Sequence, residues 1–151
     1  MTDAWQPVWF DQLQWSPARL ASAVTLGMLP DGAGLYAFTR DAGPLSSENT
    51  LYVGKADGAR QSLRRRVGVY LAHFANDKSP QSRHAGLRAL KAYYLASPDA
   101  LFLRWTGVVV ARDLEGTLVA MLDPPFNGKD EHRMGFADDE RIPEEMLFPV
   151  V

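Results

Sequence analysis

Two tyrosines, one arginine, one glutamate and one asparagine are the residues of this chain whose types and order suggest chemistry. Gly34-Leu35-Tyr36 opens one short apolar run, and Tyr52-Val53-Gly54 falls within the next. If the two runs pair as an antiparallel hairpin, the phenols of Tyr36 and Tyr52 come within side-chain reach of each other. Arg66 follows on a predicted helix, and Glu115 and Asn127 come much later.

These residue types suit the cleavage of a phosphodiester bond. The transition state gathers negative charge on the non-bridging oxygens, and an arginine fork together with a divalent ion stabilises that charge. One carboxylate with several waters is how magnesium is usually held, and the ion lowers the pKa of a bound water. A phenol is a poor base at its free pKa of about 10, so positive charge from Lys55, Arg66 or the metal is needed to favour the phenolate.

A basic helix is expected to carry part of this chemistry. It begins near residue 62, and its apolar positions repeat at helical spacing: Leu63, Val67, Tyr70, Leu71 and Phe74. Arg66, Tyr70 and His73 lie at offsets 0, 4 and 7, so they share a face and can point together at one phosphate. Arg64 and Arg65 project elsewhere, and we expect them to contact flanking phosphates.

The remaining elements predict a small α+β fold. Short apolar runs predict strands at 35–39, 51–55 and 100–107, the first two joined by a polar loop. Further helices are expected to open at Ser16-Pro17 and to span about 81–95 and 113–122, the last closed by two prolines. We therefore expect a three-stranded, mainly antiparallel sheet flanked by helices.

Composition narrows the class of protein. The 151 residues fit one ordinary domain. With no cysteine, a disulfide scaffold, a thiol nucleophile, a zinc finger and an iron–sulfur cluster are excluded. Three histidines (His73, His84 and His132) stand in no ligand spacing, so carboxylates are the remaining metal ligands. No secretory signal and no apolar stretch of the ~20 residues that span a bilayer is visible, so we expect a cytoplasmic protein with no membrane partner.

Charge divides the chain into three parts. The formal net charge is −2, yet residues 52–94 hold nine basic against two acidic residues, and residues 128–151 hold three basic against seven acidic. A polyanion such as DNA would meet the middle segment and be repelled by the tail. We expect an aromatic, partly helical extension over 1–30, a domain over 31–127, and an acidic tail over 128–151 that could also bind a basic protein partner.

Four blocks of the sequence stand out together: GLY at 34–36, YVGK at 52–55, SLRRRVGVY at 62–70 and LEGTLVAMLDPPFN at 114–127. With these blocks the chain resembles the GIY-YIG nuclease family, in particular the N-terminal nuclease domain of the bacterial excision-repair endonuclease. They come in the family's order and cover about 94 positions. The resemblance implies a GIY-YIG-like fold and an endonuclease that hydrolyses DNA by direct water attack with a single Mg²⁺ or Mn²⁺ ion.

The resemblance also implies a role for individual residues. Tyr36 is similar to the tyrosine that helps deprotonate the attacking water, and Tyr52 to the one that touches the scissile phosphate or that water. Arg66 matches the arginine that stabilises charge on the phosphate. Glu115 looks like the single metal-binding carboxylate, and Asn127 like the asparagine that holds the site together. The candidate substrate-binding residues are Lys55, Arg64, Arg65, Tyr70 and His73.

Each of these residues also has a structural explanation. Tyr36 and Tyr52 could be half-buried strand tyrosines, and Arg66 a solvated helix residue. Glu115 could be a first-turn helix acid behind an N-cap at Asp113.

The other candidates have structural explanations too. Asn127 could be an ordinary turn residue and His73 a helix-surface residue. His84 and His132 are given no role, and the tryptophans at 5, 9 and 15 are expected to cover the core. The alternative function is a non-cleaving nucleic-acid-binding or regulatory module on the same fold. The structure of the DNA substrate and the oligomeric state stay open.

Overall fold

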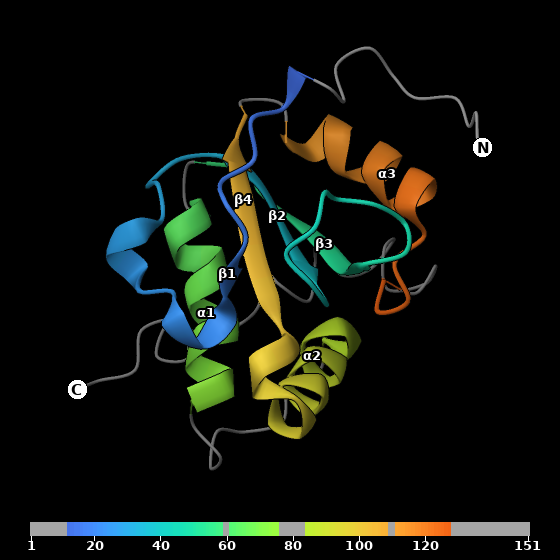
Figure 1. Ribbon diagram of the computed structural model, residues 1–151. Helices are drawn as coiled ribbons and strands as arrows, with labels where there is room; N and C mark the ends of the chain where they lie inside the picture. The colour runs from blue at the N-terminus through green and yellow to red at the C-terminus, as the bar shows by residue number, and fades with distance from the viewer. Residues whose placement is uncertain (1–11, 59–60, 76–83, 109–110, 128–151) are drawn as a thin grey trace.

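The computed structural model of this chain describes residues 12–58, 61–75, 84–108 and 111–127, and its sheet contains one antiparallel hairpin. β2 (Gly34–Thr39) pairs antiparallel with β3 (Thr50–Ala56) on one side and with β4 (Phe102–Gly107) on the other. β1 (Arg19–Leu20) pairs antiparallel with β4, so the strand order is β1-β4-β2-β3 (Figure 1). The predicted hairpin and the α+β class are confirmed, and the sheet has four strands.

The predicted three-stranded sheet is wrong because residues 16–20 run along the edge of β4. The Ser16 N–H donates to the Trp105 carbonyl at 2.7 Å, and the Trp105 N–H donates to Ser16 Oγ at 3.0 Å. The α-helix expected to open at Ser16-Pro17 is absent from residues 12–30, which hold β1 and two 3₁₀ helices, η2 (Ala21–Ala23) and η3 (Leu26–Met28). The open edge of β4 offers backbone hydrogen-bond partners, and residues 16–20 pair with it instead of forming the helix expected at Ser16-Pro17.

Helices cover both faces of the sheet. α1 (Leu63–Ala75) and α2 (Ala85–Ala96) pack on one face, and α3 (Ala111–Leu122) packs on the other, with a short 3₁₀ helix, η4 (Pro98–Ala100), before β4. Figure 1 shows the sheet between α1 and α3. None of the helices in the described ranges is long and apolar enough to cross a membrane.

Strand alternation divides the core into two clusters. Tyr36, Phe38 and Tyr52 face α1 and α2, whereas Leu35 and Val53 face α3. Trp15 packs against the second cluster, as expected of a tryptophan that covers the core; the tryptophans at 5 and 9 lie outside the described residues.

The buried stripe of α3 includes a carboxylate. Ala111, Glu115, Leu118 and Leu122 are all buried at offsets 0, 4, 7 and 11 of this helix. The helix begins two residues earlier than the predicted start at 113. Asp113 therefore lies inside the helix rather than at its N-cap, and Glu115 lies in the second turn. A first-turn interaction with the helix dipole does not explain Glu115.

Candidate active site

Three phenols from separate elements meet on the α1 face of the sheet. Tyr36 of β2 lies opposite Gly54, and Phe38 lies opposite Tyr52 of β3, so the side chains of Tyr36 and Tyr52 project to the same face. The Tyr36 hydroxyl donates to the hydroxyl of Tyr70 on α1 at 3.0 Å. The ring centroid of Tyr70 lies 5.4 Å from that of Tyr36 and 6.0 Å from that of Tyr52. The two hairpin tyrosines are buried, not half-buried, and Tyr36 has 0% of its surface exposed.

Gly54 makes room for this cluster. A Cβ built on Gly54 would lie 2.3 Å from both Cζ and Oη of Tyr36. The ring of Tyr36 therefore reaches from β2 across β3, and its hydroxyl lies over the bare Cα of Gly54. Since β3 ends the strand order, this ring points toward the sheet edge.

His84 joins the phenols, and nothing in the sequence indicated that it would. His84 is the N-cap of α2, and its Nδ1 accepts the Leu87 N–H at 3.0 Å. Its Nε2 lies 2.9 Å from the hydroxyl oxygen of Tyr52. The usual N-cap residues are Ser, Thr, Asp and Asn, so a histidine there gives no recognisable sequence signal. The contact with Tyr52 depends on how α2 packs against β3.

Arg66 and His73 lie on the same buried stripe of α1 as Tyr70. Arg66 is one turn before Tyr70, and only 6% of its surface is exposed, so it is not a solvated helix residue. His73 is 2% exposed, which corrects its reading as a surface residue. Burial, with a smaller contribution from the Lys91 charge, lowers the pKa of His73 below its usual value. The lowered pKa favours the neutral ring, so a buried His73 is a weaker source of positive charge for a phosphate than a surface histidine would be.

The other basic candidates have structural partners. Arg64 donates from Nε and Nη2 to the Leu29 carbonyl, at 3.2 and 3.0 Å, and so ties α1 to the segment before β2. Lys55 is buried, and its Nζ lies 2.7 Å from Asp57 Oδ2. Lys55 pairs with Leu35, which belongs to the α3 face, so it lies across the sheet from the phenols. Arg65 is half-buried in the first turn of α1.

Glu115 lies in the other layer of the fold, on α3, across the sheet from the three phenols. It is 4% exposed, and it lies on the stripe of α3 that packs against β3 and β2. Burying a carboxylate is costly unless positive charge or donors compensate it, and a divalent cation is one such compensation. A single carboxylate also fits magnesium, which keeps several waters when bound to protein. In the described part of the chain no group of three or more His, Asp or Glu side chains could hold a metal, so any ion there would have few protein ligands.

Asn127 closes the edge of β3. Its Oδ1 accepts the Val53 N–H at 2.8 Å, and its Nδ2 donates to the Val53 carbonyl at 3.0 Å. The neighbouring Phe126 N–H donates to the Leu51 carbonyl at 3.0 Å. One amide side chain thus satisfies both backbone groups of an edge-strand residue between the two site residues Tyr52 and Gly54. Asn127 is therefore not an ordinary turn residue, because its side chain bonds both backbone groups of Val53.

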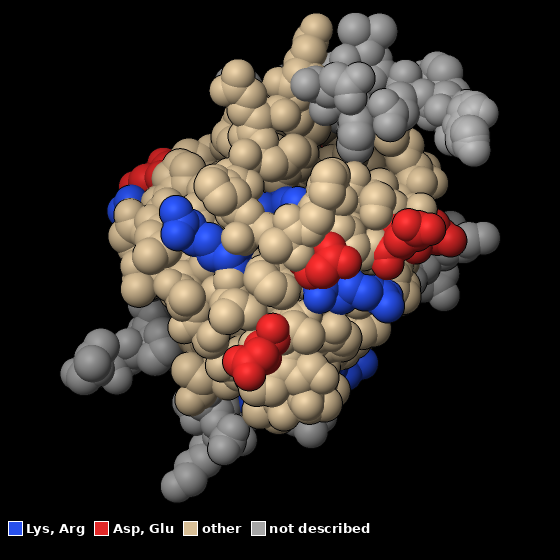
Figure 2. Space-filling view, in the orientation of Figure 1, with Lys and Arg blue, Asp and Glu red and all other residues tan. Residues whose placement is uncertain are grey.

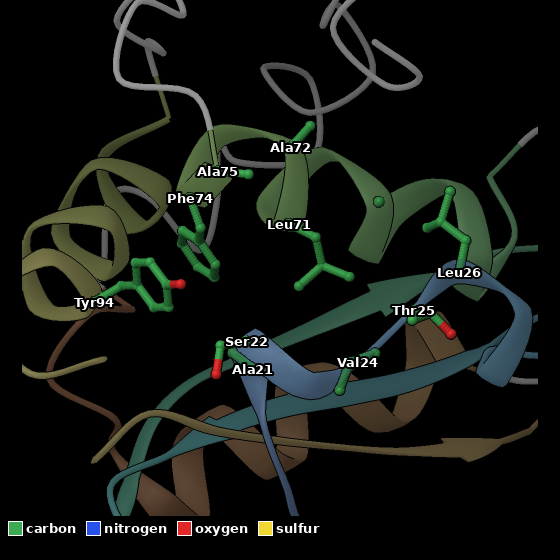
Figure 3. A pocket seen from close by; sticks show the side chains of 11 residues that line it. Ala21, Ser22, Val24, Thr25, Leu26, Leu71, Ala72, Phe74, Ala75 and Tyr94 are labelled. Carbon is green, nitrogen blue, oxygen red and sulfur yellow. The ribbon is translucent and has the colours of Figure 1, made fainter. Parts of the chain in front are cut away.

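A hollow of about 330 Å³ lies beside α1. Leu71 and Phe74 of α1 point into it, facing Ser22, Val24 and Thr25 across the gap (Figure 3). Its lining is mostly apolar and includes neither Arg66 nor any of the three clustered phenols, so it carries none of the candidate chemistry.

The visible surface shows mixed charge. On the face in Figure 2, lysines and arginines lie in small groups beside aspartates and glutamates, with uncharged side chains between them. The described residues on this face therefore form no continuous basic stripe. Part of the positive charge counted in residues 52–94 is inside the protein, since Lys55 and Arg66 are buried.

No protein-family model, curated protein or solved structure matches this chain.

Proposed function

We propose that this chain is a divalent-metal-dependent endonuclease of the GIY-YIG type, which hydrolyses DNA phosphodiester bonds by direct attack of water. The observation that carries the proposal is the convergence of Tyr36, Tyr52 and Tyr70 from three separate blocks of the sequence onto one face, beside a glycine that leaves them room. A cluster of buried phenols is more than a hydrophobic core needs, because each hydroxyl has to find a hydrogen-bond partner.

The hydrogen bonds support the implied roles of the phenols. Tyr36 donates a hydrogen bond to Tyr70, so its oxygen has lone pairs that can accept a hydrogen bond from the attacking water. Once ionised to the phenolate, that oxygen can take the proton of the water. Arg66, one turn from Tyr70, supplies a planar donor fork for the phosphate oxygens. Glu115 would hold one Mg²⁺ or Mn²⁺ ion, which when bound stabilises charge on the phosphate and the leaving oxygen. Asn127 fixes the strand between Tyr52 and Gly54.

Plasmid nicking tests this function. Supercoiled plasmid should be nicked in the presence of magnesium and left intact with a chelator. Glu115→Gln should reduce nicking at least ~100-fold, a loss typical of removing a transition-state stabiliser, while DNA binding is retained. Glu48→Gln removes a carboxylate from an exposed loop position and should nick like the parent. Parent-like cutting by Glu115→Gln would refute the assigned role of this carboxylate.

A non-cleaving module is the second candidate, and the burial of Tyr36 favours it. A hydroxyl with 0% exposure reaches a phosphate only after neighbouring side chains move aside. Such a module would retard DNA in a gel with magnesium or manganese present and leave the plasmid supercoiled. The same assay therefore separates the two functions.

A further inference from the structure

We infer that His84 is a positioning residue, which fixes the direction of the Tyr52 hydroxyl by donating a hydrogen bond to its oxygen. The geometric part of this inference needs only the contacts of His84. Its consequence for catalysis rests on the proposed nuclease function.

The helix cap decides which ring nitrogen of His84 carries the proton. The backbone N–H of Leu87 can only donate, and it points at Nδ1 from 3.0 Å. Nδ1 must therefore be the unprotonated, accepting nitrogen, and the neutral ring carries its proton on Nε2. Nε2 lies 2.9 Å from the Tyr52 oxygen, so the imidazole is the donor and the phenol is the acceptor.

This arrangement restricts what Tyr52 can do with its own proton. Since Tyr52 Oη accepts from His84, its hydroxyl proton must point away from the imidazole. The ring of His84 is buried and held at both nitrogens, and it meets Tyr52 edge to face at 5.6 Å between centroids, so it has little freedom to turn. A donor fixed on the phenolic oxygen also stabilises the phenolate that forms when Tyr52 gives up its proton. His84 thus prepares Tyr52 to act on the phosphate or the attacking water.

Nitrogen NMR of the full chain with ¹⁵N-labelled histidine tests the geometry without nucleic acid. At neutral pH, His84 should show a protonated Nε2 and an unprotonated Nδ1. Tyr52→Phe should leave this tautomer unchanged, because the helix cap sets it, and should speed exchange of the Nε2 proton with water. A proton on Nδ1, or an exchange rate that Tyr52→Phe does not change, would overturn the inference whether or not the chain cuts DNA.

His84→Asn tests the consequence for catalysis. Asparagine is a favoured N-cap and can accept the helix N–H, but it is too short to reach Tyr52 as well. The helix cap should therefore be kept, although loss of the buried imidazole and of its bond to Tyr52 should lower the free energy of unfolding. Nicking should fall by roughly tenfold, the equivalent of one hydrogen bond, and the pH of half-maximal nicking should rise.

The double variant His84→Asn/Tyr52→Phe is the control for this effect. It should nick no more slowly than Tyr52→Phe alone, since His84 acts through the Tyr52 hydroxyl. Additive losses, or a His84→Asn profile like that of the parent at every pH, would refute the positioning role. If the parent itself does not nick, the proposed function fails and the NMR result alone decides the inference.

Discussion

Gly54 has no Cβ, and the ring of Tyr36 occupies the space that one would fill. The two atoms of Tyr36 nearest to such a Cβ, at 2.3 Å, include the hydroxyl oxygen that bonds Tyr70. Real Cβ atoms do not approach other atoms so closely, and Tyr36 is fully buried, so its ring cannot swing into solvent. At the scale of single residues, the site depends on this glycine as much as on the phenols.

Gly54→Ala should therefore destabilise the protein and displace Tyr36. Overpacking a core typically costs about 1–3 kcal/mol of unfolding free energy, measurable by urea denaturation. The cost should be smaller in a Tyr36→Leu background, where the aromatic ring is gone. Gly27→Ala is the control, since a Cβ there meets nothing within 4 Å. Equal costs of Gly54→Ala in the two backgrounds would contradict this account.

At the scale of elements, the edge of β3 is completed by the segment after α3 rather than by another strand. Asp123 at the end of α3 has φ 46°, in the left-handed region that aspartate tolerates, and its N–H donates to the Val119 carbonyl at 2.8 Å. Two prolines follow and prevent the helix from continuing. The chain then reaches β3, where Phe126 and Asn127 bond the strand.

Asn127→Asp tests this edge contact. The carboxylate can still accept from the Val53 N–H, but it places a second oxygen against the Val53 carbonyl in place of a donor. We expect a loss of about 1–3 kcal/mol of unfolding free energy in urea denaturation, the cost of leaving a buried polar group unpaired. Gln14→Glu adds the same charge at an exposed position and should change stability little. A similar stability for Asn127→Asp and the parent would show that the edge contact is dispensable.

At the scale of the whole molecule, the protein surface carries less of the positive charge of residues 52–94 than the sequence alone suggests. The basic middle segment loses surface charge because Lys55 and Arg66 are buried and Arg64 is bonded to a carbonyl. DNA binding should therefore be weak and sensitive to any acidic segment nearby. Residues 128–151, with seven acidic and three basic side chains, lie outside the described residues, and the expectation for them comes from this composition alone.

Removing residues 128–151 should strengthen DNA binding at low salt by relieving repulsion. The gain should shrink as salt rises, since screening at 0.1 M acts over a length of about 10 Å. A salt titration of binding affinity for the full and shortened chains measures it. Neutralising Asp138, Asp139 and Glu140 in the full chain should reproduce part of the gain. If truncation left the affinity unchanged at every salt concentration, the predicted repulsion would be refuted. Binding of a protein partner by the tail would then be the hypothesis to test.

The sequence by itself determined the hairpin, the three helices after it and the order of the candidate residues, because alternation and helical spacing are local patterns. It did not determine the pairing of residues 16–20 with β4, the contact between His84 and Tyr52, or the layers that hold Lys55 and Glu115. Those depend on which strand edge stays open and how helices pack across the sheet. Such contacts join residues far apart in the chain, and no local pattern encodes them; only the tertiary structure decided them.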